Sequence, residues 1–324
     1  MKTIGIFPAS GALGTSTYTH LLKLVPNERV ILINRHPEKV AQQYVEAGVN
    51  VRQASYESAP EELEAAFTGV EVLFLISYPS HVHEYRVKVQ IPAIDAARRA
   101  GVKHIFYSSL GFGSDPAGAR PTKASSLAVV MQAHLDSEAY LAGLARSDPS
   151  FTYTSVREGL YSESFPIYTA FLDPRSPPAD GAVRIPHDGS GPGVAWVKRD
   201  ELGEATAALI ARHSGAAGLP GFPEGYVNGS ALLTGQRVWT LAETVEVLAR
   251  AAGTQLRIQQ VPVEEYVRLP QVVGRFGSED KARTWATAWE AIRAGETSVV
   301  SPELVEILGR QPEEFDVTIK QMFS

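Results

Sequence analysis

Short apolar segments alternate with amphipathic helical segments through the first half of this chain, and no other feature restricts its fold so strongly. The strand segments are apolar on both faces, as in strands that are buried from both sides. They are expected at residues 2–7, 29–34, 50–54, 70–77, 103–109 and 151–156. Helices are expected between them, at 12–24, 37–47, 60–67, 84–100 and 125–145. This alternation predicts an α/β fold, a doubly wound, Rossmann-like parallel sheet with helices on both faces.

The pattern changes in the second half of the chain. Residues 173–193 are dense in proline and glycine, which predicts a loop next to a pocket and excludes a long helix or a central strand. A short strand and then a helix from near Asp200 are expected to return to the sheet. The last third is mostly helical, and one helix there has a capping box at Thr240 and Glu243 and a stop at Gly253.

The stretch "FPASGALGTST" joins the first strand to the first helix. Glycines at such a bend allow a sharp turn and a close approach of the backbone to a diphosphate, and the helix N-terminus offers unpaired N–H groups. Glycines are also common at strand-to-helix turns in general, so the motif alone does not decide the function. The residues expected to face a diphosphate are Ser10, Gly11, Ala12, Leu13 and Gly14.

The second strand ends in "NRHPEK", which places Arg35 after the strand and Lys39 one helical turn later. Folds that select NAD usually carry an acid there, which accepts a hydrogen bond from the ribose 2′-hydroxyl, whereas a cation suits the 2′-phosphate of NADP. Residues 33–35 contain no acid. The sequence therefore predicts NADP(H) as the cofactor, and the alternative is that both cations belong to a solvated face.

Composition excludes several other classes of function. The net charge of −6 and the pI near 5.8 disfavour nucleic acid as a partner, because such binding needs a basic surface. There is no cysteine, so thiol chemistry is excluded. His81, His83 and Glu84 lack the second cluster that a zinc site needs, so no metal is expected. Without a signal peptide or a long apolar run, we expect a cytoplasmic protein with no membrane partner.

These observations give a domain organisation. Residues 1–156 are expected to form a dinucleotide-binding Rossmann domain, completed by about 194–235. Residues 157–193 and 236–324 are expected to form a smaller, mainly helical substrate-binding lobe.

The glycine turn, "NRHPEK" and several longer segments together resemble the NmrA-like family of atypical short-chain dehydrogenases/reductases, and within it the type 2 NADPH:quinone oxidoreductases. The longer segments are "IPAIDAARRAGVKHIFYSSLGF", "FTYTSVREGLYSESF", "VAWVKRDELGEATAALI" and "TGQRVWTLAETVEVLA". The resemblance implies an NADPH-dependent oxidoreductase that passes hydride directly to a quinone or a related conjugated carbonyl. It implies a small-molecule substrate and leaves a homodimer open.

The chain departs from the family pattern at three places. Pro8 occupies the first glycine position of the turn, which removes one backbone N–H. Ser55 stands where the family often has an acid near the adenine. His134 stands where many members have a lysine, and the chain also lacks, at the expected helix, the Tyr-x-x-x-Lys pair that extended short-chain reductases use. Two alternatives therefore remain open: a non-catalytic NADP(H)-sensing regulatory protein, and a biosynthetic reductase or isomerase of the same fold.

Ligands of open α/β sheets bind at the carboxyl ends of the strands, which is where the remaining site residues are expected. His134 and Tyr161 are the candidate catalytic residues, since each can donate a hydrogen bond to an acceptor. A satisfied histidine on a helix and a packed tyrosine are the respective alternatives. The residues expected to flank the ribose or nicotinamide, or to close the pocket, are Ser77, Tyr78, Pro79, Ser108 and Leu160.

Overall fold

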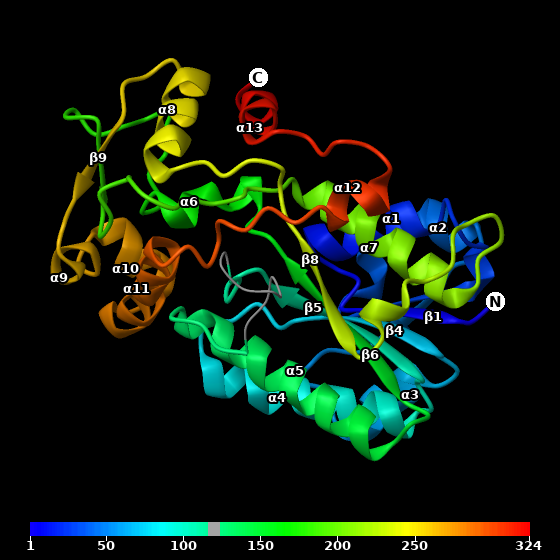
Figure 1. Ribbon diagram of the computed structural model, residues 1–324. Helices are drawn as coiled ribbons and strands as arrows, with labels where there is room; N and C mark the ends of the chain where they lie inside the picture. Colours follow the sequence, from blue (N-terminus) through cyan, green and yellow to red (C-terminus); the bar gives the residue numbers. More distant parts are fainter. Residues whose placement is uncertain (116–123) are drawn as a thin grey trace.

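The computed structural model describes residues 1–115 and 124–324 (Figure 1). Within these residues, seven parallel strands form one sheet in the order β3-β2-β1-β4-β5-β6-β8, and β7 pairs with β9 in a second sheet. The strands are β1 (Ile4–Phe7), β2 (Val30–Asn34), β3 (Asn50–Gln53), β4 (Val72–Ile76), β5 (His104–Leu110), β6 (Thr152–Glu158), β7 (Ala182–Ile185), β8 (Gly229–Leu233) and β9 (Arg257–Gln260). The sequence prediction of a doubly wound parallel sheet is confirmed.

Helices cover both faces of the large sheet. α1 packs against α7 on one face, and α3, α4 and α5 lie side by side on the other (Figure 1). The helices are α1 (Ala12–Leu21), α2 (Gln42–Glu46), α3 (Pro60–Phe67), α4 (His83–Arg99), α5 (Val129–Ser147), α6 (Phe165–Tyr168), α7 (Arg199–Ser214), α8 (Leu241–Ala252), α9 (Val263–Tyr266), α10 (Pro270–Phe276), α11 (Glu279–Arg293), α12 (Glu303–Leu308) and α13 (Phe315–Phe323).

The central strands are buried because their side chains on both faces are apolar. β1 and β2 are buried along their whole length, and so are Val72–Leu75 of β4. One apolar cluster lies between the sheet and α1 with α7, and another lies between the sheet and α3, α4 and α5. The carboxyl ends of the central strands are thereby held at one edge of a rigid sheet.

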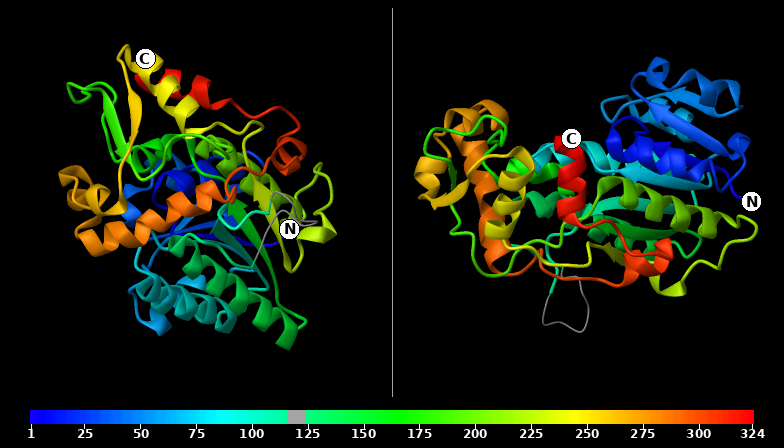
Figure 2. Two further views of the ribbon diagram at one scale, coloured as in Figure 1. Left: turned by 60° about the vertical axis from the view of Figure 1, so that its left-hand side comes forward. Right: turned by 90° about the horizontal axis from the view of Figure 1, so that it is seen from above.

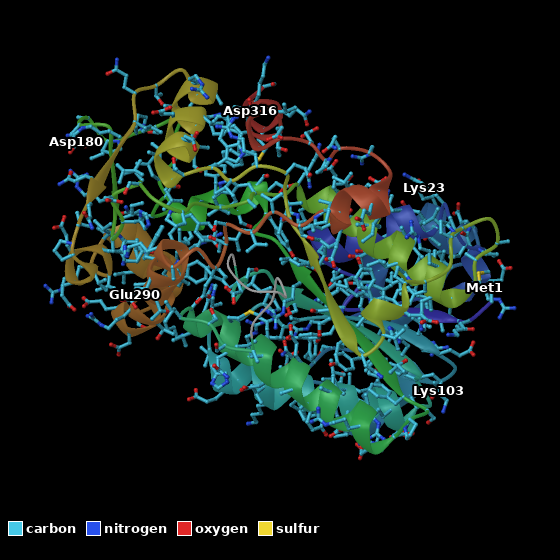
Figure 3. All side chains as sticks on the ribbon, viewed as in Figure 1. Met1, Lys23, Lys103, Asp180, Glu290 and Asp316 are labelled. Atoms are coloured by element: carbon cyan, nitrogen blue, oxygen red, sulfur yellow. The ribbon has the colours of Figure 1, made fainter. Side chains whose placement is uncertain are left out.

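A third apolar cluster is centred on a lobe, which we define as residues 165–193 and 236–295 (Figure 2), and it also takes in side chains of α5 and α13. Its core is aromatic, with Trp196 from the connection to α7 in contact with Tyr168 and Phe315. Charged side chains such as Asp180 and Glu290 point outward from it (Figure 3). In α8 the predicted capping box forms: the Thr240 hydroxyl accepts from the Glu243 N–H at 3.1 Å, and the Thr240 N–H donates to the Glu243 carboxylate at 2.8 Å.

Three details of the sequence interpretation were wrong. The segment 173–193 is a loop except at β7, which forms because its register with β9 places it beside a strand 75 residues later, from Ala182 to Arg257. The short strand expected before α7 is reduced to isolated bridges at Val194 and Val197. The strand that returns to the sheet is β8, which follows a turn at Asn228 and was not expected.

The contact between α1 and α7 depends on Gly203. A Cβ at this position would lie 2.1 Å from the Ser16 hydroxyl oxygen and 2.6 Å from the Ser16 Cβ. We expect Gly203→Ala to lower the free energy of unfolding by about 1–3 kcal/mol, because the two helices must move apart. Urea unfolding followed by circular dichroism measures this. Gly143→Ala, where α5 leaves room for a methyl group, is the control and should not lower stability; equal losses in the two variants would refute the packing argument.

Candidate active site

A cavity of about 410 Å³ lies at the carboxyl ends of β4, β5 and β6. The loop after β4, the end of β5 and the segment after β6 form one side, α4 and α5 contribute Arg86, Val130 and His134, and the lobe contributes Tyr168 and Trp285. This is the edge at which the sequence predicted a ligand. The predicted site residues that line it are Leu13, Ser77, Tyr78, Pro79, Ser108, His134, Leu160 and Tyr161.

The glycine turn lies at the start of α1, whose Leu13 reaches the cavity. Gly11 precedes the helix with φ of 92°, a conformation that favours glycine, and no atom lies within 4 Å of where its Cβ would be. A Cβ on Gly14 would lie 2.7 Å from the carbonyl oxygen of Ala9, so only glycine permits this close approach. Ser10, Gly11 and Ala12 are exposed at the helix N-terminus, as a diphosphate site requires.

Arg35 lies just after β2, exposed, and forms an ion pair with Glu57. Glu57 also accepts hydrogen bonds from the hydroxyls of Tyr78, at 2.8 Å, and Tyr85, at 3.4 Å. The hydrogen bond to Glu57 raises the pKa of Tyr78 to about 12. Lys39 is exposed at the end of the 3₁₀ turn Pro37–Lys39. Glu57 stands two residues after Ser55, and the sequence interpretation did not single it out.

His134 belongs to a buried polar network. An Arg86 Nη2–H donates to its Nε2 at 2.7 Å, and its Nδ1 lies 3.3 Å from the Tyr107 hydroxyl. A guanidinium group can only donate, so Nε2 accepts and Nδ1 carries the proton. Burial, and then the charge of Arg86, hold the pKa of His134 well below its usual value, so the ring is neutral. Both ring nitrogens have protein partners, and a direct contact of His134 with a substrate stays a prediction.

The same network holds the loop after β4. Gln90 of α4 accepts a hydrogen bond from the Tyr78 N–H at 2.8 Å and donates to the hydroxyls of Tyr107, at 3.2 Å, and Ser137, at 2.8 Å. α4, α5 and β5 are thereby tied to the cavity loop by buried hydrogen bonds, which favours a single arrangement of the site.

Glu158 and Tyr161 form a pair at the end of β6. The Tyr161 hydroxyl is hydrogen-bonded to Glu158 Oε2. Glu158 is only 1% exposed, and this burial raises its pKa to about 7, while hydrogen bonds from Tyr161 and Ser108 limit the rise. A carboxyl group with this pKa can hold a proton near neutral pH and release it. Sequence reasoning singled out Tyr161 and missed Glu158, because β6 carries several polar residues and the burial of this one carboxyl group is set by the tertiary structure.

Aromatic rings form the wall of the cavity on the side of the lobe. His81 lies 5.4 Å from the ring of Trp285 and 5.3 Å from the ring of Phe276, and Tyr168 lies 5.7 Å from Trp285. His83 is instead the first residue of α4 and contacts Asp136 at 2.6 Å. Flat rings suit a planar, conjugated ligand.

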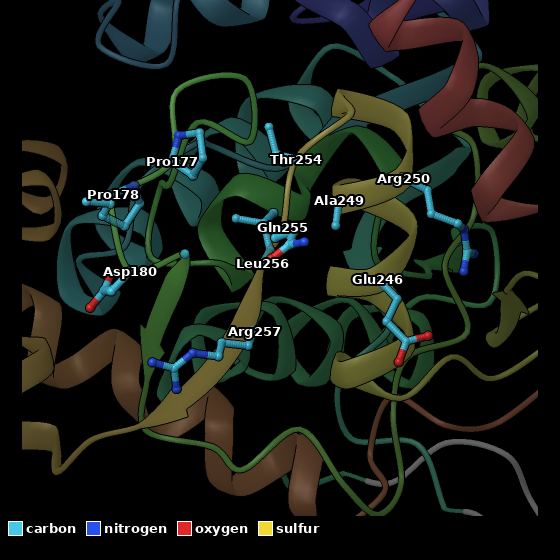
Figure 4. A pocket seen from close by; sticks show the side chains of 12 residues that line it. Pro177, Pro178, Asp180, Glu246, Ala249, Arg250, Thr254, Gln255, Leu256 and Arg257 are labelled. Atoms are coloured by element: carbon cyan, nitrogen blue, oxygen red, sulfur yellow. The ribbon is translucent and has the colours of Figure 1, made fainter.

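A larger hollow, of about 890 Å³, lies in the lobe between the loop at 177–181, α8 and residues 254–257 (Figure 4). Its charged residues, Asp180, Glu246, Arg250 and Arg257, are spread around it (Figure 4). None of the predicted site residues lines this hollow. We therefore place the chemistry at the sheet edge, where titratable groups converge.

Across the described part of the chain, no helix is long and apolar enough to cross a membrane.

The sequence profile of the NmrA-like family matches residues 1–277. The chain is 30% identical over 307 residues to an NmrA-like family domain-containing oxidoreductase, flvB, of Aspergillus flavus, a match that covers 94% of this chain and 89% of that protein.

Two solved structures resemble the whole chain. Citrobacter sp. triphenylmethane reductase complexed with NADP(H) has a TM-score of 0.71 and 28% identity, over 98% of this chain and 99% of the other. The NADPH-dependent quinone oxidoreductase of Escherichia coli complexed with NADPH has a TM-score of 0.75 and 26% identity, over 99% and 100%.

Proposed function

Because this chain belongs to the NmrA-like family, we propose that it is an NADPH-dependent reductase that transfers hydride directly to a quinone or a related conjugated carbonyl. The observation that carries the proposal is the Glu158–Tyr161 pair, a proton source in an aromatic-walled cavity at the sheet edge. The names of the oxidoreductase and quinone oxidoreductase relatives support it.

The cofactor is NADP(H), and the residues present fit it. The open space at Gly11 and the exposed N-terminus of α1 leave room for a diphosphate. We assign the diphosphate to Ser10, Gly11, Ala12, Leu13 and Gly14, and the 2′-phosphate to Arg35 and Lys39. Ser77, Tyr78, Pro79, Ser108 and Leu160 are assigned to the ribose and nicotinamide. When bound, the reduced nicotinamide supplies the hydride.

The protein has to supply a proton to the acceptor and stabilise the negative charge that forms on it. Hydride addition leaves negative charge on the carbonyl oxygen of the acceptor, which must gain a proton. When Glu158 is protonated, its carboxyl can donate to the Tyr161 oxygen, and the Tyr161 proton is then free to point toward the acceptor. Transfer of that proton to the acceptor is followed by transfer from Glu158 to Tyr161. The lobe's aromatic rings orient a planar acceptor and exclude water.

The decisive experiment is the loss of absorbance at 340 nm when NADPH is mixed with 1,4-benzoquinone, a conjugated enone and a simple ketone. We expect turnover with the first two. Tight NADPH binding without turnover of any acceptor would contradict the proposal and leave the alternative of an NADP(H)-sensing regulatory protein. Turnover of the enone alone would favour a biosynthetic reductase of the same fold.

A further inference from the structure

Arg86 is a buried cation at the cavity wall. It lies in the first turn of α4, is 4% exposed and lines the cavity. Its Nη2 donates to His134 at 2.7 Å, and its Nη1 makes only a long contact, 3.4 Å, with the carbonyl oxygen of Val130. Its Nε has no hydrogen-bond partner among the described residues.

A second buried arginine, Arg157, has the carboxylate partner that Arg86 lacks within the described part of the chain. Arg157 is also 4% exposed, but its guanidinium is hydrogen-bonded to the Glu138 carboxylate at 3.0 and 2.5 Å. No described carboxylate lies within ion-pairing distance of Arg86. An arginine cannot lose its charge in a protein, so a buried one without a counter-ion is costly unless a ligand supplies the negative charge.

The groups around Arg86 do not supply that charge. His134 meets it through a neutral nitrogen, and His81 lines the same cavity. Burial, and then the charge of Arg86, lower the pKa of His81. Glu158 lines the cavity too but pairs with Tyr161. Neutral groups thus hold the guanidinium in place, and Arg86 lines a cavity that has room for a ligand.

We propose that Arg86, positioned by His134, binds a negatively charged oxygen of the substrate in this cavity. This inference rests on the proposed function and defines its substrate class further. Two sources share this chemistry: a permanent carboxylate on an acidic conjugated acceptor, and the oxyanion that forms on a neutral acceptor as hydride arrives. A guanidinium N–H suits either one, because a charge-assisted hydrogen bond is stronger than a neutral one.

The first test measures binding without turnover, so its outcome is independent of whether the protein reduces quinones. Benzoate and its uncharged counterpart benzamide are titrated in the presence of NADP⁺ and followed by tryptophan fluorescence, since Trp285 lines the cavity. We expect benzoate to bind at least about tenfold more tightly to the unaltered protein. No preference for benzoate would overturn the proposal without any variant.

Variants of Arg86 test whether this residue causes the preference for benzoate over benzamide. Arg86→Met should abolish the preference for benzoate, and Arg86→Lys, which keeps the charge and the fold, should retain part of it. Lys88→Met removes an exposed cation two residues along α4 and is the matched control, with the preference unchanged. A preference that survives in Arg86→Met, or a loss of NADPH affinity in place of a loss of benzoate affinity, would overturn the assignment.

Steady-state kinetics with neutral 1,4-benzoquinone distinguish a permanent substrate carboxylate from a developing oxyanion as the group that Arg86 binds. If the oxyanion is the ligand, Arg86→Met should lower kcat at least about tenfold with little change in KM. If a permanent carboxylate is the ligand, kcat for the neutral quinone should be unchanged, and KM should rise only for an acceptor that carries a carboxylate. Absence of any turnover would refute the proposed function, while the benzoate result would still decide the role of Arg86.

Discussion

Replacing Glu158 with glutamine is expected to lower kcat for quinone reduction on the order of 10²-fold, because the buried proton source is removed while its shape is kept. In the unaltered protein kcat should fall as the pH rises through about 7, where Glu158 loses its proton. Glu158→Gln should lack this inflection. Steady-state NADPH oxidation between pH 6 and 9 measures both effects.

A control for this variant lies on the same segment. Glu163 accepts hydrogen bonds from the Arg199 N–H and does not line the cavity, so Glu163→Gln should keep the pH profile of the unaltered protein. If Glu158→Gln has an unchanged kcat and the same inflection, Glu158 does not supply the proton.

The same carboxyl makes stability depend on pH. The pKa of Glu158 is about 7 in the folded protein against 4.5 for an unperturbed glutamate, so folding favours its protonated form. Its contribution to stability is fully present below about pH 4.5 and is lost as the pH rises through about 7, a loss of about 3 kcal/mol. Glu158→Gln should therefore unfold at a higher urea concentration than the unaltered protein at pH 8, with the difference vanishing below about pH 4.5. A difference that does not depend on pH would contradict this assignment.

Replacing Arg35 with alanine is expected to weaken NADPH binding roughly tenfold to a hundredfold and to leave NADH binding unchanged. The guanidinium lies after β2, where the extra phosphate of NADPH would reach it. Titration of each nucleotide by tryptophan fluorescence measures the preference. Equal affinities of the unaltered protein for the two nucleotides would refute the role of Arg35.

A substitution of Glu57 tests the same phosphate contact from the other side, because Glu57 is the ion-pair partner of Arg35. In the structure it pairs with Arg35, so a phosphate must share or replace that contact. Glu57→Gln should raise the affinity for NADPH and change that for NADH little. Arg99→Ala, which breaks another partly exposed ion pair at 2.8 Å with Glu64, is the matched control and should alter neither affinity.

Local sequence patterns were enough to predict the central sheet, the glycine bend and the position of Arg35. The alternation of apolar strands and amphipathic helices predicted the sheet, because burial on both faces leaves a direct trace in the sequence. The bend at Gly11 and the caps of α8 were also readable, since each depends on a few neighbouring residues. The position of Arg35 after β2 followed from the strand boundary alone.

Long-range packing decided the rest. β7 is a strand only because β9 lies beside it, and β8 completes the sheet although glycine begins it. Glu57, which follows β3, forms an ion pair with Arg35, which follows the neighbouring strand β2. Arg86 meets a neutral histidine of α5, His134, where a carboxylate could have stood. The pKa of Glu158 likewise depends on its burial at the sheet edge. A charged group is affected by other charges near it in space and by the water it loses on burial. Neither the distance between two groups nor their burial can be read from the residues next to them in the chain.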